Sequence, residues 1–158
     1  MQKLSDDDFR FVIKSTPLVS IDLIVENPDK KILLGRRSNS PAKNHWFVPG
    51  GRIVKDELFE NAFKRITESE LGIAFSINQA KPVGTYEHLY PNDNYLEDKS
   101  FSTHYLVNAF HIKLPSHLEK LPSDQHTKYW WATESELLND EEVHINTRNY
   151  FNGHAPFI

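Results

Sequence analysis

A single acidic side chain stands on the apolar face of one predicted helix. Between about Glu57 and Leu71, apolar residues recur at helical spacing, and at about 100° per residue they fall within an arc of roughly 140°. Glu70 projects into that arc. A carboxylate near a core costs several kcal/mol unless a cation or hydrogen-bond donors compensate it. The arc comprises Leu58, Phe59, Ala62, Phe63 and Ile66, whereas Glu57, Glu60 and Glu68 point the other way and are typical of a solvated face.

Two explanations of Glu70 are open from spacing alone. It is partly buried or paired with Arg65 or Arg52, or it binds a metal ion. The segment upstream favours the second explanation, because two glycines after Pro49 would let the backbone turn tightly and bring a bare carbonyl close to an ion. A strand, a glycine turn and a helix with one inward acid indicate a magnesium site built from oxygen ligands.

The N-terminal third predicts a helix followed by a hairpin. Ser5 with three aspartates after it has the form of an N-cap, and the helix should end before Pro17. Residues 18–25 are rich in Val and Ile, and a turn signal at 27–30 separates them from residues 32–34. We expect these two runs to pair as antiparallel strands.

The remaining elements predict a mixed sheet with helices packed on it. The long helix should close at Gly72, which has the position of a C-cap. A capping box at 133–136 indicates a further helix start. We expect an α+β chain with one domain over residues 1–158. The expected strands are 46–48, 79–90, 101–113 and 129–131, and a terminal helix is expected over 140–151.

Composition excludes several classes of function. The 158 residues include no cysteine, so disulfides, zinc-thiolate sites and thiol nucleophiles are excluded. A net charge of -4 leaves no basic excess for following a nucleic acid. The N-terminus lacks the order of a signal peptide, and no apolar run approaches the roughly 18 residues of a membrane span. We therefore expect a cytoplasmic protein with no nucleic-acid or membrane partner.

The sequence around Glu70 resembles the Nudix box, whose general form is GX5EX7REUXEEXGU with U aliphatic. The matching residues run from Gly51 through Glu57 and Arg65 to Glu70, Leu71, Gly72 and Ile73. Two acids of the box are replaced, by Ile66 and Ser69, and Thr67 stands at an aliphatic position. This degenerate box resembles that of the GDP-mannose mannosyl hydrolase family, and the similarity extends over residues 15–27, 33–52, 101–107 and 121–131.

The resemblance implies a Nudix fold, with a mixed β-sheet sandwiched between helices in an α/β/α arrangement. It also implies hydrolysis of GDP-mannose, or of GDP-glucose, to GDP and the free sugar by attack of water at the anomeric carbon with inversion. One Mg²⁺ per site would be held by the Gly50 carbonyl, Glu70 and Gln125, with Mn²⁺ as an alternative ion. A homodimer is the implied assembly.

The resemblance also assigns side chains to the reaction. His126 would be the general base, since an unperturbed imidazole accepts a proton near neutral pH. Arg37 and Arg52 would neutralise the diphosphate, and Tyr105 would donate to the same oxygens. Asp22, an acid in an apolar strand, would touch the sugar or the catalytic groups, or bond to a neighbouring strand. Three further residues are assigned to substrate binding or support: Phe9 at the guanine, His88, and Arg65, for which bracing of the box loop is the preferred role.

Two other functions are compatible with this sequence. A nucleotide-sugar pyrophosphatase would attack phosphorus and release GMP and a sugar 1-phosphate. The replaced acids at positions 66 and 69 argue against it. A catalytically silent nucleotide-binding domain would bind without turnover that depends on Mg²⁺.

Overall fold

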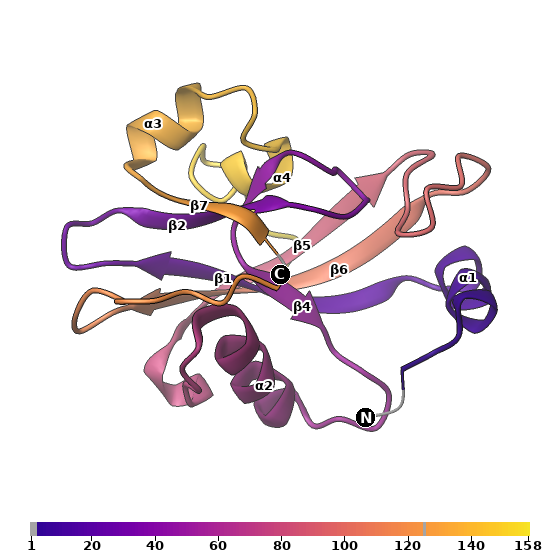
Figure 1. The fold of residues 1–158 in the computed structure, drawn as a ribbon, viewed down its shortest axis with the longest axis horizontal. Coiled ribbons are helices and arrows are strands. Elements are labelled where there is room, and N and C mark those ends of the chain that lie inside the picture. The colour runs from indigo at the N-terminus through magenta and orange to yellow at the C-terminus, as the bar shows by residue number, and fades with distance from the viewer. Residues whose placement is uncertain (1–2, 125) are drawn as a thin grey trace.

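Seven strands form one mixed sheet within residues 3–124 and 126–158, which the computed structural model describes (Figure 1). The main path runs β3-β2-β1-β6-β5, with β4 paired to β1 and β7 paired to β2. The pair β1 and β6 is parallel, and the other pairs are antiparallel. The strands are β1 (Leu18–Glu26), β2 (Ile32–Arg37), β3 (Trp46–Phe47), β4 (Gly50–Arg52), β5 (Lys81–Tyr90), β6 (Thr103–Lys113) and β7 (His126–Ala132).

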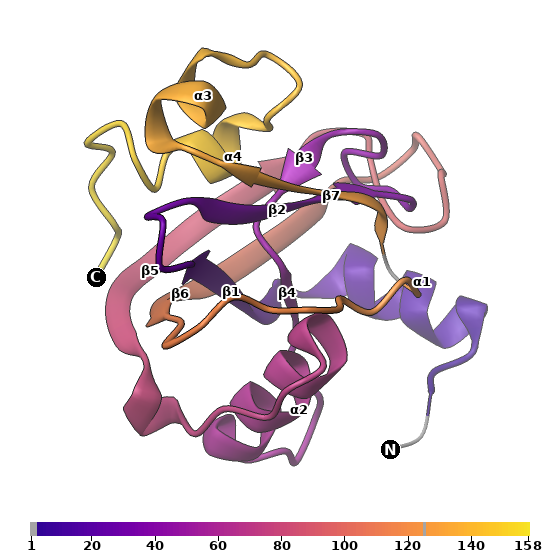
Figure 2. The same ribbon diagram turned by 60° about the vertical axis from the view of Figure 1, so that its left-hand side comes forward.

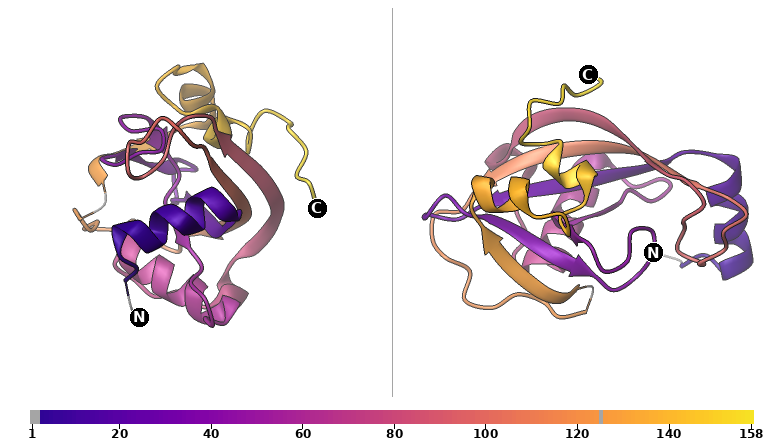
Figure 3. Two further views of the ribbon diagram at one scale, coloured as in Figure 1. Left: turned by 90° about the vertical axis from the view of Figure 1, so that its right-hand side faces the viewer. Right: turned by 90° about the horizontal axis from the view of Figure 1, so that it is seen from above.

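Helices cover both faces of this sheet, as the α/β/α expectation requires. Figures 1 and 2 show α2 on one side and α3 with α4 on the other, while α1 lies at one end of the sheet (Figure 3). None of the helices in the described ranges is long and apolar enough to cross a membrane. The helices are α1 (Asp6–Ser15), α2 (Phe59–Leu71), α3 (Glu134–Asn139) and α4 (Ile145–Arg148), with a 3₁₀ turn at Ile77–Gln79.

Side-chain alternation along β1 divides the core into two layers. Ile21, Leu23 and Val25 pack with α2, whereas Ile24 packs on the opposite face, toward the C-terminal helices. Successive side chains of a strand point to opposite faces, so Asp22 shares the face of Ile24. Asp22 therefore lies on the side of the sheet that the C-terminal segment covers.

Most local signals are confirmed. The Ser5 hydroxyl oxygen accepts from the Asp8 amide at the start of α1, and Gly72 ends α2 with a φ of 74°. The hairpin pairs Glu26 with Ile32. The capping box at Thr133 is also formed.

Helix α2 begins later than its apolar spacing predicts. Leu58 is the N-cap residue and is 72% exposed, so it does not belong to the buried arc. Glu57 does not lie on a solvated face, because it accepts two hydrogen bonds from Arg65. The described contacts of Arg65 are with Glu57 and the Arg52 carbonyl, and they do not include Glu70.

Three other expectations are wrong, each because the segment pairs with a part of the chain that is distant in sequence. Gly50 and Gly51 do not form a tight turn, because they lie in β4 and pair with β1. The terminal helix is short, because the backbone of Trp46 bonds to Glu142 and His144 and holds that segment extended. The last strand is longer than expected, since β7 reaches back to His126.

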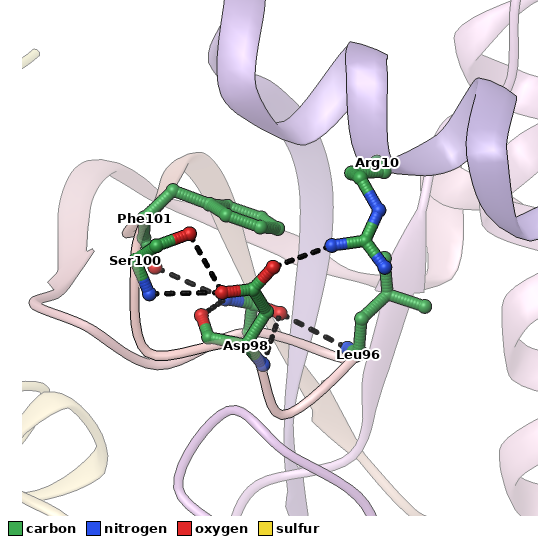
Figure 4. A network of polar contacts seen from close by, with 6 residues as sticks. Arg10, Leu96, Asp98, Ser100 and Phe101 are labelled. Atoms are coloured by element: carbon green, nitrogen blue, oxygen red, sulfur yellow. Dashed lines mark hydrogen bonds and ion pairs between the residues drawn. The ribbon is translucent and has the colours of Figure 1, made fainter.

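The loop after β5 is tied together by its own hydrogen bonds (Figure 4). The buried Asn94 side chain donates to the carbonyls of Asp98 and Phe101. Asp98 accepts from the Ser100 amide and hydroxyl and pairs with Arg10 of α1 at 2.5 Å. The loop thereby attaches α1 to the end of the sheet.

Candidate functional site

A polar cleft lies where β1 and β2 separate. The two strands pair at Glu26 and Ile32. Away from that pair, β1 pairs with β4, whereas β2 pairs with β3 and β7. The cleft encloses about 730 Å³ of non-atom space, its open mouth included. Its lining includes six of the predicted site side chains and one predicted carbonyl ligand: Asp22, Arg37, Arg52, His88, Tyr105, His126 and Gly50.

The backbone of Gly50 faces away from β1. Hydrogen bonds from Leu23 to Pro49 and from Ile53 to Val19 show that the bonded positions alternate with the Asp22–Gly50 pair. In an antiparallel ladder, the residues of such a non-bonded pair direct their carbonyls outward. The described strands include no partner for β4 on that outer side, so the Gly50 carbonyl is open to a ligand.

Glycine at position 50 is explained by the side chain across the ladder. A Cβ there would lie 2.6 Å from Oδ1 of Asp22 and 2.5 Å from the Ile21 carbonyl oxygen. The Asp22 carboxylate thus occupies the space of the absent side chain. A close approach, rather than the predicted turn, requires this glycine.

Helix α2 brings Glu70 to the other side of β4. Ile66 lies against Gly51, where an added Cβ would be 3.1 Å from Cγ1 of Ile66. Glu70 is one turn further along the same helix face and is only 2% exposed, which confirms its inward orientation. Its Oε2 lies 2.9 Å from Nε2 of His126, the first residue of β7.

Both arginines of the cleft rest on aromatic rings. The Arg52 guanidinium carbon lies 4.2 Å from the centroid of Phe9, and that of Arg37 lies 5.2 Å from the centroid of Phe47. Phe9 also meets the Tyr95 ring edge to face at 5.8 Å. Phe9 is not among the cleft-lining residues, and its observed ring partners are Arg52 and Tyr95. A cation above an aromatic face is attracted to it, and this contact orients the guanidinium.

Three polar side chains contact one another at the inner wall of the cleft. The Tyr150 hydroxyl donates to Oδ2 of Asp22 at 2.6 Å and lies 3.5 Å from Nε2 of His88. Burial raises the pKa of Asp22 to about 6, although the Tyr150 hydrogen bond and the Arg37 charge act to lower it. Burial lowers the pKa of His88 to about 4. His88 is therefore neutral near pH 7, and Asp22 titrates just below that pH.

Arg65, a predicted substrate contact, takes other partners. Arg65 bonds to Glu57 at 2.7 and 2.9 Å and to the Arg52 carbonyl at 2.8 Å, and it does not line the cleft. The Glu57 hydrogen bonds raise the pKa of Arg65, and Arg65 in turn lowers that of Glu57. Arg65 therefore braces the start of the box. Gln125, the third predicted metal ligand, lies outside the described residues.

The oxygen atoms of Glu70 and Gly50 are of the type that a hard cation prefers when it keeps most of its coordination shell for substrate and water oxygens. Within residues 3–124 and 126–158, no group of three or more His, Asp or Glu side chains is arranged to hold a metal ion. Glu70 and the outward Gly50 carbonyl supply one anionic and one neutral oxygen. Mg²⁺ often binds in this way, through one or two protein oxygens together with substrate phosphates and water.

Sequence reasoning missed Tyr150, Phe47 and Gly35. Tyr150 is 128 residues from its partner Asp22, and nothing in the local pattern of its segment indicates that contact. Phe47 occurs in a short apolar strand, where packing is the ordinary role. Gly35 lies in β2 without a turn signal. Strand pairing brings Phe47 and Gly35 to the site, and the packing of the C-terminal segment brings Tyr150 to it.

Comparison with known proteins agrees with this architecture. The family model described as "NUDIX domain" matches residues 16–152. The chain is 37% identical to low-salt glycan biosynthesis protein Agl8 of Haloferax volcanii over 112 residues, which cover 71% of this chain and 69% of that protein. It is 40% identical to an ADP-ribose pyrophosphatase of Methanocaldococcus jannaschii over 57 residues, which cover 36% of this chain and 33% of that protein.

A solved structure shows the same fold. The MutT NUDIX hydrolase from Burkholderia pseudomallei superposes with a TM-score of 0.68 at 23% identity, covering 87% of this chain and 97% of that one. The family match spans most of the chain, including β1, the box helix and α4. From the family model and the relatives together, this chain belongs to the Nudix hydrolase family.

Proposed function

We propose that this Nudix hydrolase cleaves GDP-mannose at the sugar carbon and releases GDP and mannose. Water attacks the anomeric carbon, the bond from that carbon to the β-phosphate oxygen breaks, and the attacking water gives its proton to a base. The observation that carries this proposal is the pairing of Glu70 with His126. Glu70 is the only acid left at the Ile66, Ser69 and Glu70 positions of the box, and an imidazole lies 2.9 Å from it.

Replacement of the other acids weakens the case for attack at phosphorus. Ile66, which stands at one acid position, is 1% exposed and packs from α2 into the core with residues of β1. Its aliphatic side chain has no atom that could bind a second metal ion beside the diphosphate. A site with one anionic ligand leaves its cation strongly positive toward the leaving group, which suits departure of GDP.

Arg37, Arg52 and Tyr105 supply the complement to the diphosphate. All three line the cleft, and the arginines are held by Phe47 and Phe9. Burial raises the pKa of Tyr105, so its hydroxyl stays a donor at neutral pH. Donors fixed before the reaction stabilise charge that develops on the leaving group.

The proposed ligands of Mg²⁺ are Glu70, the Gly50 carbonyl and Gln125. The ion would stabilise the charge that develops on the diphosphate as the sugar bond breaks. A cation held at Glu70 would weaken that carboxylate as an acceptor for His126. The His126 imidazole, which lines the cleft, is the proposed acceptor of the proton from the attacking water.

The name of the 37% identical relative supports a sugar-linked substrate, since it places that protein in glycan biosynthesis. GDP-glucose is the second proposed substrate, because it differs from GDP-mannose only in the direction of one hydroxyl. We further propose a homodimer in the cytoplasm, on the resemblance to the mannosyl hydrolases. Sedimentation of the purified chain tests the dimer.

A pyrophosphatase is the second candidate, and the local match to an ADP-ribose pyrophosphatase favours it. Hydrolysis in ¹⁸O-labelled water separates the two reactions. Carbon attack places the label in the released sugar and yields unlabelled GDP. Label in a phosphate product, together with GMP, would establish attack at phosphorus. Absence of turnover across a panel of nucleotide sugars with Mg²⁺ would leave a binding domain.

A further inference from the structure

The ring of His126 lies directly on the backbone of Gly35 in β2. A Cβ at position 35 would lie 2.4 Å from Nδ1, 2.6 Å from Cγ and 2.8 Å from Cε1 of His126. Non-bonded heavy atoms are most stable at about 3.5 Å. Any side chain at position 35 would therefore push the imidazole away from β2 by about 1 Å.

A bulge in the pairing of β2 with β7 produces this contact. Gly35 lies opposite Tyr129, and Arg37 lies opposite His126, so two residues of β7 face a single residue of β2. Such a bulge re-aims the side chains beside it. It places His126 across from Arg37 and diagonal to Gly35, which lies on the same strand face as Arg37 because side chains alternate.

Other contacts fix the ring from its remaining sides. Nε2 meets Glu70 at 2.9 Å, and the Tyr129 ring lies 5.4 Å away, centroid to centroid, at 60°. Nδ1 is buried and has no hydrogen-bond partner among the described residues. The side chain is 9% exposed and lines the cleft. Movement away from Gly35 would change the geometry at Glu70.

Backbone conformation does not account for the glycine. Gly35 is not among the described residues with positive φ, and it lies within a regular strand. Glycine is unfavourable in a strand interior, since it loses more conformational freedom on folding than other residues do. The close approach of the imidazole is the feature of the structure that requires it.

We propose that Gly35 is a positioning residue for His126: its missing side chain creates the seat in which the imidazole contacts Glu70 and faces the cleft. The claim that Gly35 makes room for the ring depends on the geometry alone. The claim that this position of the ring matters for catalysis rests on the proposed function. Because alanine fits the backbone of position 35, the strain that Gly35→Ala introduces is expected at the contact with the ring.

A double-mutant cycle tests the seat. The four chains are wild type, Gly35→Ala, His126→Ala and the double variant, and the measurements are Tm, kcat and KM with GDP-mannose. Gly35→Ala should lower Tm by about 3 to 8 °C in the presence of His126, since overpacking strains the site. In the His126→Ala background, the same substitution should leave Tm unchanged or raised, because the clash is gone.

The kinetic arm uses the same four chains. Gly35→Ala should lower kcat by about 10-fold or more with KM changed less than about 3-fold, since small displacements of a reacting group are costly. It should not lower the residual kcat of His126→Ala further. Equal losses of Tm in both backgrounds would overturn the seat. If wild type fails to turn over GDP-mannose, the proposed function fails, while the Tm cycle still decides the role of Gly35.

Discussion

Tyr150 reaches across the molecule to hold Asp22: its hydroxyl lies 2.6 Å from Oδ2 of a carboxylate 128 residues earlier in the chain. The turn after α4 thus lies behind the wall of the cleft and contacts a residue that lines it, although the Nudix box is far away in sequence. Because burial raises the pKa of Asp22 and this bond opposes the rise, Tyr150 helps to keep Asp22 ionised.

Tyr150→Phe removes that donor. We expect a loss of about 1.5 to 3 kcal/mol in the free energy of unfolding at pH 7, the usual range for a hydrogen bond to a charged group. Urea denaturation measures it. The control is Tyr95→Phe, at a tyrosine that is 44% exposed. In an Asp22→Asn background the loss should shrink, and an unchanged loss there would show that Tyr150 acts through packing alone.

Asp22→Asn should stabilise the fold at pH 7 while it lowers activity. The pKa of Asp22 is about 6 in the folded chain, against 3.8 for an unperturbed aspartate, so the folded state binds the proton more tightly than the unfolded chain does. The contribution of Asp22 to stability therefore falls as pH rises from about 4 to about 6. Asparagine carries no such titration. We expect a gain of about 1 to 3 kcal/mol over wild type at pH 7 that vanishes near pH 4.

Urea unfolding at pH 4, 5, 6 and 7 checks the Asp22→Asn prediction. The difference between the two proteins should grow with pH across this window. A variant that is less stable than wild type at pH 7 would contradict the raised pKa.

Phe9→Leu tests whether Phe9 orients Arg52 or touches the nucleobase. Loss of the cation-π contact should weaken binding of inorganic pyrophosphate and of GDP alike, by about 2- to 5-fold. Calorimetric titration with Mg²⁺ present measures both. The matched control is Phe11→Leu, at a position on the same helix that is 71% exposed. Weaker binding of GDP with unchanged binding of pyrophosphate would assign Phe9 to the guanine instead.

Glu70→Gln removes the proposed anionic metal ligand and keeps the shape of the side chain. Turnover that depends on Mg²⁺ should fall by about 10²-fold or more, because a bound cation supplies several kcal/mol of charge stabilisation. Binding of Mn²⁺, followed by paramagnetic resonance, should weaken in parallel. Glu68→Gln, on the exposed side of the same helix, is the control. Full Mn²⁺ affinity in Glu70→Gln would place the metal elsewhere.

Local chemistry made much of the scaffold predictable. Four features depend on neighbours in sequence: the cap at Ser5, the hairpin from β1 to β2, the capping box at Thr133 and the end of α2 at Gly72. The inward orientation of Glu70 follows from helical periodicity, and the burial of its side chain is confirmed. These features are determined by side chains within a few residues of each other, so the sequence alone was sufficient for them.

The site itself was decided by long-range pairing. A glycine pair after a proline has the form of a turn, yet β1 pairs with Gly50 and Gly51 and makes them a strand. The apolar spacing along α2 does not indicate that Glu57 would bond to Arg65. It also does not indicate that Glu70 would contact His126. Strand register and bulges set which side chains share a face, and they depend on contacts that no local pattern contains. The sequence therefore determined the elements and the inward acid, while the tertiary structure alone determined the neighbours of that acid.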